Sequence, residues 1–143
     1  MSRKPRPRWR SDCPISISLE VFGDRWTLLV VRDLMFKGRH AFKDFLSSEE
    51  RIATNVLAER LRRLETHQLV VKRQHPADAR RAEYHLTEKG ISLAPVLLDM
   101  IVWAATHETT AAPAAIVRRM RDDRERFLAD LRATLRASLQ RAR

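Results

Sequence analysis

The chain has 143 residues, which is enough for one domain with a sizeable hydrophobic core. Its formal net charge of +10 is concentrated at the two ends: residues 1–10 and 118–143 carry +5 each, and residues 11–117 are neutral. The excess charge therefore describes the ends of the chain and does not by itself identify a nucleic acid as the partner.

The sequence also argues against several classes of protein. The single cysteine, Cys13, rules out a disulfide within the chain and fits a reducing, cytoplasmic compartment. No apolar run reaches about 18 residues, and no apolar segment follows the basic N-terminus, so we expect no membrane span and no secretory signal. The histidines lack metal-ligand spacing, and no catalytic arrangement can be picked out. We therefore predict no enzyme, no metal site and no cofactor.

The N-terminal residues 1–11 are rich in Arg and Pro and predict a disordered basic arm. Such an arm either lies along DNA or only keeps the protein soluble. The first helix is expected to begin at Cys13 and Pro14, because proline is favoured at the first helical position. Gly23 would end this helix. Its apolar face would consist of Ile15, Leu19 and Phe22.

A second helix is expected after Asp24, which is a good N-cap. Arg25 and Asp33 would face away from its apolar side. The apolar positions recur at helical spacing: Trp26, which reads as a core anchor, Leu29, Val30 and Leu34.

A short third helix is predicted from Phe42, Phe45 and Leu46, and residues 47–51 would connect it to the next helix. Residues 38–41 form a break with room for a very short strand that pairs with a later hairpin. Basic side chains here are candidates for DNA phosphate contacts, which position a protein without selecting a sequence. These candidates are Lys37, Arg39, His40 and Lys43.

Residues 52–65 predict the helix around which the chain is organised. Leu57, Leu61 and Leu64 recur at i, i+4 and i+7 and define an apolar face, and Thr54 is a suitable N-cap. Polar and arginine side chains on the other face are the types that read base edges in the major groove. Taken alone, the pattern favours an ordinary solvated helix face. The polar face carries Asn55, Ala58, Glu59, Arg62 and Arg63, with Arg60 near its edge.

The segment after this helix favours DNA binding. Residues 68–75 and 82–86 predict two strands, joined by a polar turn at residues 76–81. Arg80 and Arg81 would lie at the tip of this hairpin, with Lys72 and Arg73 on its first strand. A helix followed by a basic hairpin is the layout of a winged helix-turn-helix. We therefore predict a mainly α fold with a small β-hairpin, in which the hairpin, or wing, touches the DNA flank.

This layout assigns roles to the polar side chains. The candidates for base edges are Thr54, Asn55, Glu59, Arg62 and Arg63, and Arg60 is a candidate for a base or a phosphate. The candidates for wing contacts are Arg73, Arg80 and Arg81, and those for phosphates near the third helix include Arg39 and Lys43.

Two further helices are expected after the wing. Thr87 caps a long one with a broad apolar stripe, and Pro95 inside it either kinks the helix or places its start later. The last helix begins at about Pro113, and we expect its apolar face to pack on a partner subunit in preference to a membrane. The apolar stripe of the helix after Thr87 includes Leu93, Leu97, Met100, Ile101 and Trp103. The apolar face of the last helix includes Met120, Phe127, Leu128, Leu131, Leu135 and Leu139.

Several blocks of the chain, in order, resemble the HxlR-type transcriptional regulators. The opening is Cys13-Pro14-Ile15 with residues 22–29 and 32–34. The recognition-helix block is residues 52–57 with Arg60, Leu61 and Leu64, and the end of the wing is residues 83–90. The resemblance covers residues 12–108. It implies a homodimeric, DNA-binding winged helix-turn-helix regulator with extra dimerisation helices, the N-terminal and post-wing ones. Its operator would be a palindrome with half-sites about 10 bp, or a multiple of that, apart.

The sequence departs from the family pattern in three places. Gln68 stands where members usually carry the glycine that ends the recognition helix in a left-handed conformation. Either Gln68 or His67 must therefore adopt that conformation at some strain, or the helix must end differently. Ala41 stands where a basic residue is common. Residues 113–143, read as a C-terminal amphipathic helix, lie outside the pattern.

Cys13 carries a second hypothesis, because some members of this family sense oxidants through a cysteine at this position. At a helix N-terminus beside Arg8 or Arg10, the thiolate that oxidises would be favoured. The alternative is a small capping or packing residue that never reacts.

We therefore predict a homodimeric repressor that binds double-stranded DNA and whose effector the sequence does not identify. The competing hypothesis is a winged-helix module for protein contacts that lacks specific DNA binding.

Overall fold

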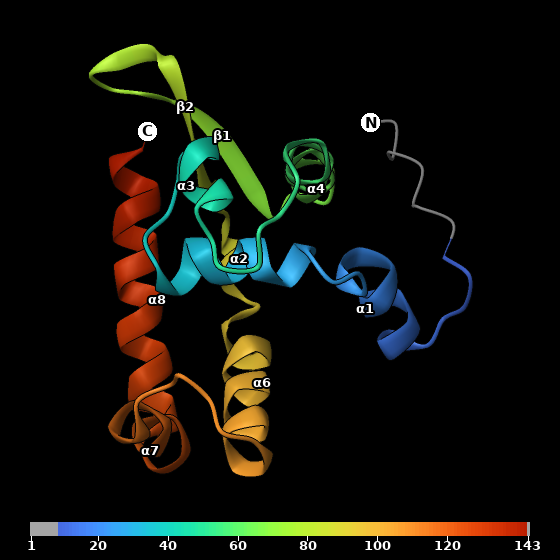
Figure 1. Ribbon diagram of the computed structural model, residues 1–143, viewed down its shortest axis with the longest axis vertical. Helices are drawn as coiled ribbons and strands as arrows, with labels where there is room; N and C mark the ends of the chain where they lie inside the picture. Colours follow the sequence, from blue (N-terminus) through green and yellow to red (C-terminus); the bar gives the residue numbers. More distant parts are fainter. Residues whose placement is uncertain (1–8, 143) are drawn as a thin grey trace, which may run out of the picture.

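The computed structural model describes residues 9–142, which fold into a mainly helical domain with one two-stranded hairpin (Figure 1). This confirms the predicted fold class. The helices are α1 (Pro14–Phe22), α2 (Thr27–Phe36), α3 (Phe42–Leu46), α4 (Thr54–Thr66), α5 (Glu88–Ile91), α6 (Ala94–His107), α7 (Ala114–Asp122) and α8 (Arg124–Arg141). The strands are β1 (Val70–His75) and β2 (Asp78–Leu86).

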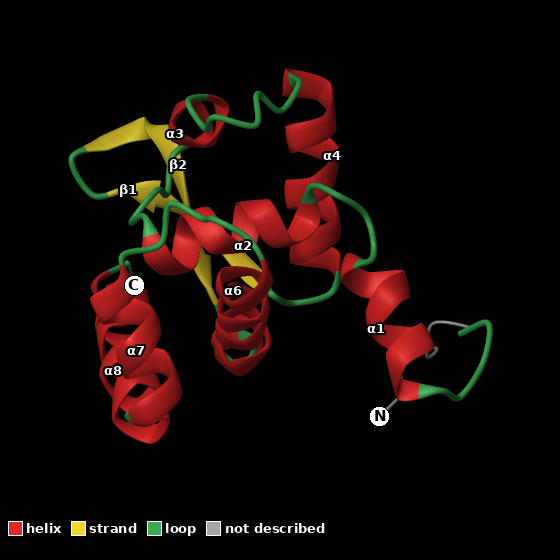
Figure 2. Cartoon of the chain, turned by 60° about the horizontal axis from the view of Figure 1, so that its bottom comes forward, coloured by secondary structure: helices red, strands yellow, loops and turns green. Residues whose placement is uncertain are grey.

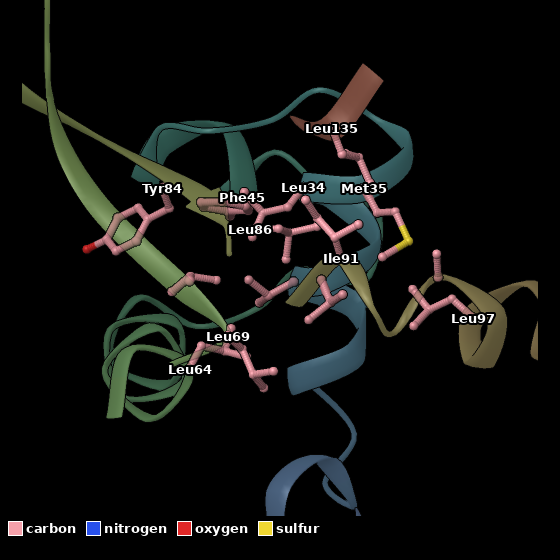
Figure 3. Close-up of a cluster of buried hydrophobic side chains, with 14 of the residues drawn as sticks. Leu34, Met35, Phe45, Leu64, Leu69, Tyr84, Leu86, Ile91, Leu97 and Leu135 are labelled. Atoms are coloured by element: carbon pink, nitrogen blue, oxygen red, sulfur yellow. The ribbon is translucent and has the colours of Figure 1, made fainter. Parts of the chain in front are cut away.

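One hydrophobic core joins the helix-turn-helix to the segments that follow the wing. Figure 3 shows Leu34 of α2, Phe45 of α3, Leu64 of α4 and Leu135 of α8 around the same cluster. The predicted apolar face of α4 is fully buried, since Leu57, Leu61 and Leu64 are at most 1% exposed. Burying a leucine in this way stabilises the fold by roughly 1.5–3 kcal/mol. The core therefore fixes α4 and leaves its other face free.

The helix ends largely follow the expected chemistry. Cys13 is the N-cap of α1 with Pro14 behind it, and Gly23 is its C-cap. The N-cap residue of α2 is Trp26, two residues after the predicted Asp24. The Asp24 carboxylate still makes the capping hydrogen bonds, because it accepts from the backbone N–H groups of Trp26 and Thr27.

The N-cap prediction for α4 is wrong by one residue. Ala53 occupies that position with an extended backbone, and Thr54 is the first, exposed helical residue. Arg51, two residues before Ala53, has φ of 57° and turns the chain toward the helix.

The wing is an antiparallel hairpin with an irregular tip. Its register pairs Val70 with Leu86 and Gln74 with Ala82, but then His75 pairs with Asp78. Residues 79–81 are therefore left out of the regular pairing. The turn itself is residues 76–77, so Arg80 and Arg81 lie beside the tip, whereas the sequence placed them at its apex. The very short strand expected at residues 38–41 is present as a single bridge between Ala41 and Glu83.

Of the alternatives for the end of α4, the structure shows the left-handed conformation at Gln68, with φ of 61°. The backbone N–H of Leu69 then donates to the carbonyl of Leu64 at 2.8 Å. The chain passes from there directly into β1, and Gly90 packs against this junction. A Cβ at Gly90 would lie 2.1 Å from the Leu69 carbonyl oxygen.

The long helix expected after Thr87 is two helices. The Thr87 hydroxyl accepts from the Gly90 N–H and caps the short α5, and α6 begins at Ala94 with Pro95 in its first turn. By length and composition the segment Glu88–His107 could cross a bilayer, contrary to the expectation from apolar runs. Burial in the protein core accounts for part of its apolar content, because Ile91, Ala94, Leu97 and Leu98 are at most 5% exposed, whereas Val96, Met100 and Trp103 are exposed.

The single C-terminal helix expected from Pro113 is also two helices, because the backbone breaks at Asp123 (φ −131°, ψ 45°). Both pack on their own domain: Leu128 and Leu135 join the common core. Arg124 pairs with Asp99 of α6 at 2.6 Å, and Arg136 pairs with Glu88 of α5 at 2.8 Å. The apolar face of α8 therefore packs on the core of its own chain, whereas the sequence indicated that it would pack on a second subunit.

Of the predicted basic arm, residues 1–8, including Arg8, lie outside the described part. Within residues 9–11, the Trp9 ring stacks on His67 with ring centres 6.4 Å apart. The backbone N–H of Arg10 donates to the Glu20 carboxylate at 3.3 Å. These residues rest on the domain, so the disorder predicted for residues 1–11 does not extend to them.

Candidate nucleic-acid interface

The outer face of α4 carries most of the predicted base contacts. Thr54, Asn55 and Arg62 are exposed, and Glu59 is half-buried. This face begins with short polar side chains and becomes basic one turn later. Because the buried leucines fix the helix from behind, these side chains have a defined direction and remain accessible to a groove.

Two of the predicted contacts instead hold α4 in place. The Arg60 Nε lies 2.6 Å from Asp24 Oδ2, and its guanidinium also contacts the Glu59 carboxylate. Arg63 Nη2 donates to the carbonyl of Glu20, at the end of α1, at 2.9 Å. Because both guanidinium groups make contacts within the chain, we leave Arg60 and Arg63 out of the proposed base readout.

The Asp24 carboxylate is the centre of this junction. Burial raises its pKa, but hydrogen bonds from Thr27, Arg60 and two backbone N–H groups outweigh burial and lower the pKa to about 2. One carboxylate thereby caps α2 and ties it to α4. The sequence indicated the cap; it gave no sign that Arg60, 36 residues further on, would share it.

A second charged network holds the connection between α3 and α4. Arg32 makes a two-pronged contact with Glu50, with both N–O distances 2.8 Å, and it also pairs with the buried Asp33. Ser48 donates to Asp33, and Arg39 donates to the Ser48 hydroxyl at 2.7 Å. The Arg32 hydrogen bond is the main reason that the pKa of Glu50 falls to about 2.

This network changes two predictions. Asp33 is 2% exposed and central to the network, whereas the sequence placed it on the outer side of α2. Arg39 lies within the network, so it is a weaker candidate for a phosphate contact than Lys43, which is exposed on α3. For Glu50 the sequence indicates only a solvated turn, because the pair with Arg32 forms only in the folded chain.

The wing presents its basic side chains to solvent. Arg73, Arg80 and Arg81 are all exposed. Arg80 and Arg81 stand in the irregular part of β2, where side chains are not constrained by regular pairing. Figure 2 shows α3, the start of α4 and the wing at the same end of the molecule. One surface thus contains a polar helix face flanked by a basic hairpin.

The base of the wing contains a histidine cluster that the sequence did not reveal. The rings of His40 and His85 stack with centres 4.4 Å apart. His85 is 5% exposed, and its ring nitrogens lie 3.2 Å from Glu83 Oε2 and from the Ser138 hydroxyl of α8. Burial, aided by His40, lowers the pKa of His85, against the opposing effect of Glu83. The cluster joins the wing to α8.

Apolar side chains gather on α1 and α6. Ile15 and Leu19, from the predicted apolar face of α1, are exposed, and Met100 and Trp103 of α6 are exposed as well. Exposed apolar patches on soluble proteins often mark interaction sites. Cys13, at the start of α1, is exposed on the same helix.

Comparison with known proteins relates this arrangement to regulators of transcription. A family model described as HxlR-like helix-turn-helix matches residues 21–112. An HTH-type transcriptional regulator of Synechocystis, sll1512, is 36% identical over 88 residues, which are 62% of this chain and 64% of that protein. The regulator YodB of Bacillus subtilis is 34% identical over 93 residues, covering 64% of this chain and 82% of YodB.

Solved structures show the same relationship. The reduced form of YodB aligns with a TM-score of 0.56 at 33% identity and covers 68% of this chain and 95% of that one. The redox regulator HypR, in its oxidised form, aligns with a TM-score of 0.60 at 28% identity and covers 68% of this chain and 100% of that one. The family match ends before α7, so α7 and α8 are additions to the shared part.

Proposed function

The chain belongs to the HxlR-like family of helix-turn-helix transcriptional regulators, and on that premise we propose that it binds a palindromic operator in double-stranded DNA as a cytoplasmic homodimer and represses transcription. The observation that carries this proposal is the outer face of α4. It is exposed, polar and basic, and it stands beside a wing with three exposed arginines.

In this proposal α4 enters the major groove. Thr54 and Asn55 lie at its first turn, where short side chains reach base edges, and Arg62 lies nearly two turns further along. Glu59 sits between them and is suited to accept from a cytosine amino group. Arg73, Arg80 and Arg81 contact the flanking backbone or minor groove, and Lys43 a phosphate.

The homodimer is proposed to form through α1 and α6. Exposed apolar side chains on these two helices are the surface that a second copy would cover: Ile15, Leu19, Val96, Met100 and Trp103. Trp103 is 66% exposed, and burying an aromatic of this size supplies a large part of an interface energy. A two-fold axis between the subunits sets the palindrome and its half-site spacing.

The deciding experiment is selection from a random duplex pool at near-physiological salt. A palindromic motif with half-sites about 10 bp, or a multiple, apart is the expected result. Binding that enriches no motif and vanishes as salt rises would reduce the interaction to counterion release. The chain would then be better explained as a winged-helix module for protein contacts.

We further propose that Cys13 makes the regulator responsive to thiol oxidants. Cys13 is exposed at the N-cap of α1, one of the two helices assigned to the dimer, so a modified thiol would act at the subunit interface. Solved neighbours include YodB in reduced, quinone-bound and diamide-treated forms. With diamide, two Cys13 thiols would give one disulfide while the oxidant takes up two electrons and two protons. Cys13→Ser should abolish diamide-induced release from DNA; release that persists would eliminate this role.

A further inference from the structure

The basic end of α8 is a surface that the proposed readout by α4 and the wing does not use. After Asp130 the chain has no acidic residue up to position 143, whereas it has four arginines there. These are Arg132, Arg136, Arg141 and Arg143. A run of like charge is often only a solvated face, so its place in the fold decides its meaning.

The fold holds this end of α8 in a defined position. Leu135 is buried in the common core, and Arg136 pairs with the Glu88 carboxylate through two contacts of 2.8 and 3.1 Å. One half-turn later the Ser138 hydroxyl lies 3.2 Å from His85 Nδ1 at the base of the wing. The C-terminal part of α8 is therefore held by two contacts, one with α5 and one with β2.

This contact places Arg141 beside the turn of the wing. A hollow of about 350 Å³ lies between them. From the wing side it is lined by His40, His75, Pro76, Ala77, Glu83 and His85, and from α8 by Ser138, Arg141 and Ala142.

Arg141 is the uncompensated charge of the hollow. Its only acid, Glu83, is engaged by His75 at 3.5 Å and by His85 at 3.2 Å. Arg141 is exposed, and among residues 9–142 no carboxylate pairs with it.

The hollow lies beside the turn of the wing, the segment that is assigned to the DNA flank. The C-terminal end of α8 lies beside the wing, with α4 on the other side of the wing strands in Figure 1. A duplex that lies in contact with α4 and the wing turn would carry its backbone past this point. A guanidinium is well suited to a phosphate at such a site.

We propose that Arg141 binds a DNA phosphate outside the segment read by α4, so that α8 lengthens the DNA footprint beyond that of the shared family fold. This rests on the proposed function, since it assumes that duplex DNA passes the turn of the wing. The contact adds affinity without sequence choice, because phosphates carry no sequence information.

The test is the salt dependence of binding by the full chain, compared with Arg141→Ala, Arg141→Lys and Arg118→Ala. Arg118 is a matched control, because it is an exposed arginine on α7 and lines a different hollow. The probes are a long duplex with the selected motif, a random duplex of equal length, and a duplex trimmed to the half-sites. Thermal unfolding verifies that each variant folds.

On the long and the random duplex, we expect Arg141→Ala to reduce the slope of log affinity against log salt by about 0.9, and to weaken binding roughly fivefold at 0.15 M salt. Arg141→Lys and Arg118→Ala should keep the wild-type slope, and on the trimmed duplex Arg141→Ala should match the wild type. An unchanged slope for Arg141→Ala, or an equal loss for Arg118→Ala, would overturn the proposal. A wild type without motif preference would instead refute the proposed function, and the random duplex still measures the Arg141 contact in that case.

Discussion

Replacing Asp24 with Asn tests whether the Asp24–Arg60 junction is a structural joint of the helix-turn-helix. Folding lowers the pKa of Asp24 from 3.8 to about 2, so the folded chain favours the charged carboxylate by about 2 kcal/mol. Asn keeps the size and one acceptor but not the charge. We therefore expect Asp24→Asn to lower the free energy of unfolding by about 2 kcal/mol at pH 7, and the Tm by about 4–8 °C.

The assay is urea unfolding at fixed protein concentration, because dimerisation would make stability depend on concentration. Asp99→Asn is the matched control: Asp99 pairs with Arg124 at 2.6 Å but its side chain is 66% exposed, so its loss should be under about 1 kcal/mol. Since the folded pKa is depressed, the contribution of Asp24 is present above pH 3.8. It is lost as the pH falls toward 2.

A double-mutant cycle with Arg60→Met completes the test. Partners in one contact should show a coupling energy above about 0.5 kcal/mol. Arg60→Met should also keep the operator preference, because the side chain is assigned to the joint and not to a base. Equal losses for Asp24→Asn and Asp99→Asn, or additive effects of Asp24→Asn and Arg60→Met, would refute the reasoning.

Three further predictions concern the readout, the wing base and the α4–β1 junction. Asn55→Ala should relax the sequence preference found in the duplex selection. Arg81→Ala should instead weaken binding to the operator and to random duplex equally and should reduce the salt dependence of binding. A wing substitution that changes the selected motif would contradict the assignment. Burial lowers the pKa of His85 in the folded chain, so its contribution to stability is complete above about pH 6.5 and is lost as the pH falls through the lowered pKa. The free energy of unfolding in urea should therefore depend on pH between 5 and 8, and His85→Gln should reduce that dependence. Gly90→Ala should destabilise by about 1–3 kcal/mol in the same assay, because its Cβ would overlap the Leu69 carbonyl, and a neutral result would mean that α5 can shift.

The fold was predictable where neighbouring residues determine structure. The spacing of Leu57, Leu61 and Leu64 gave the buried face of α4, and Pro14 and Gly23 gave the limits of α1. The missing glycine indicated a strained helix end, and Gln68 is the residue that adopts the left-handed conformation. These features depend on periodicity and on backbone preferences that are visible in a short window of sequence.

The rest depends on contacts between distant parts of the chain. The roles of Arg60, Arg63 and Arg39 could not be inferred locally, because an arginine on a helix edge looks the same whether it meets a phosphate or a carboxylate. Pro95 correctly indicated a later start for α6, whereas no local signal was recognised for the break at Asp123. The cluster of His40 and His85 unites a loop and a strand that lie 45 residues apart.

The position of Leu135 in the common core has a consequence for synthesis. In chain order it comes after every other residue of that core, yet it packs with α2 and the wing segment. While α8 is still inside the ribosome, the helix-turn-helix exposes the apolar surface that Leu128 and Leu135 later cover. The helix-turn-helix therefore completes its core only after residue 135 has emerged, and until then the nascent chain leaves this apolar surface uncovered.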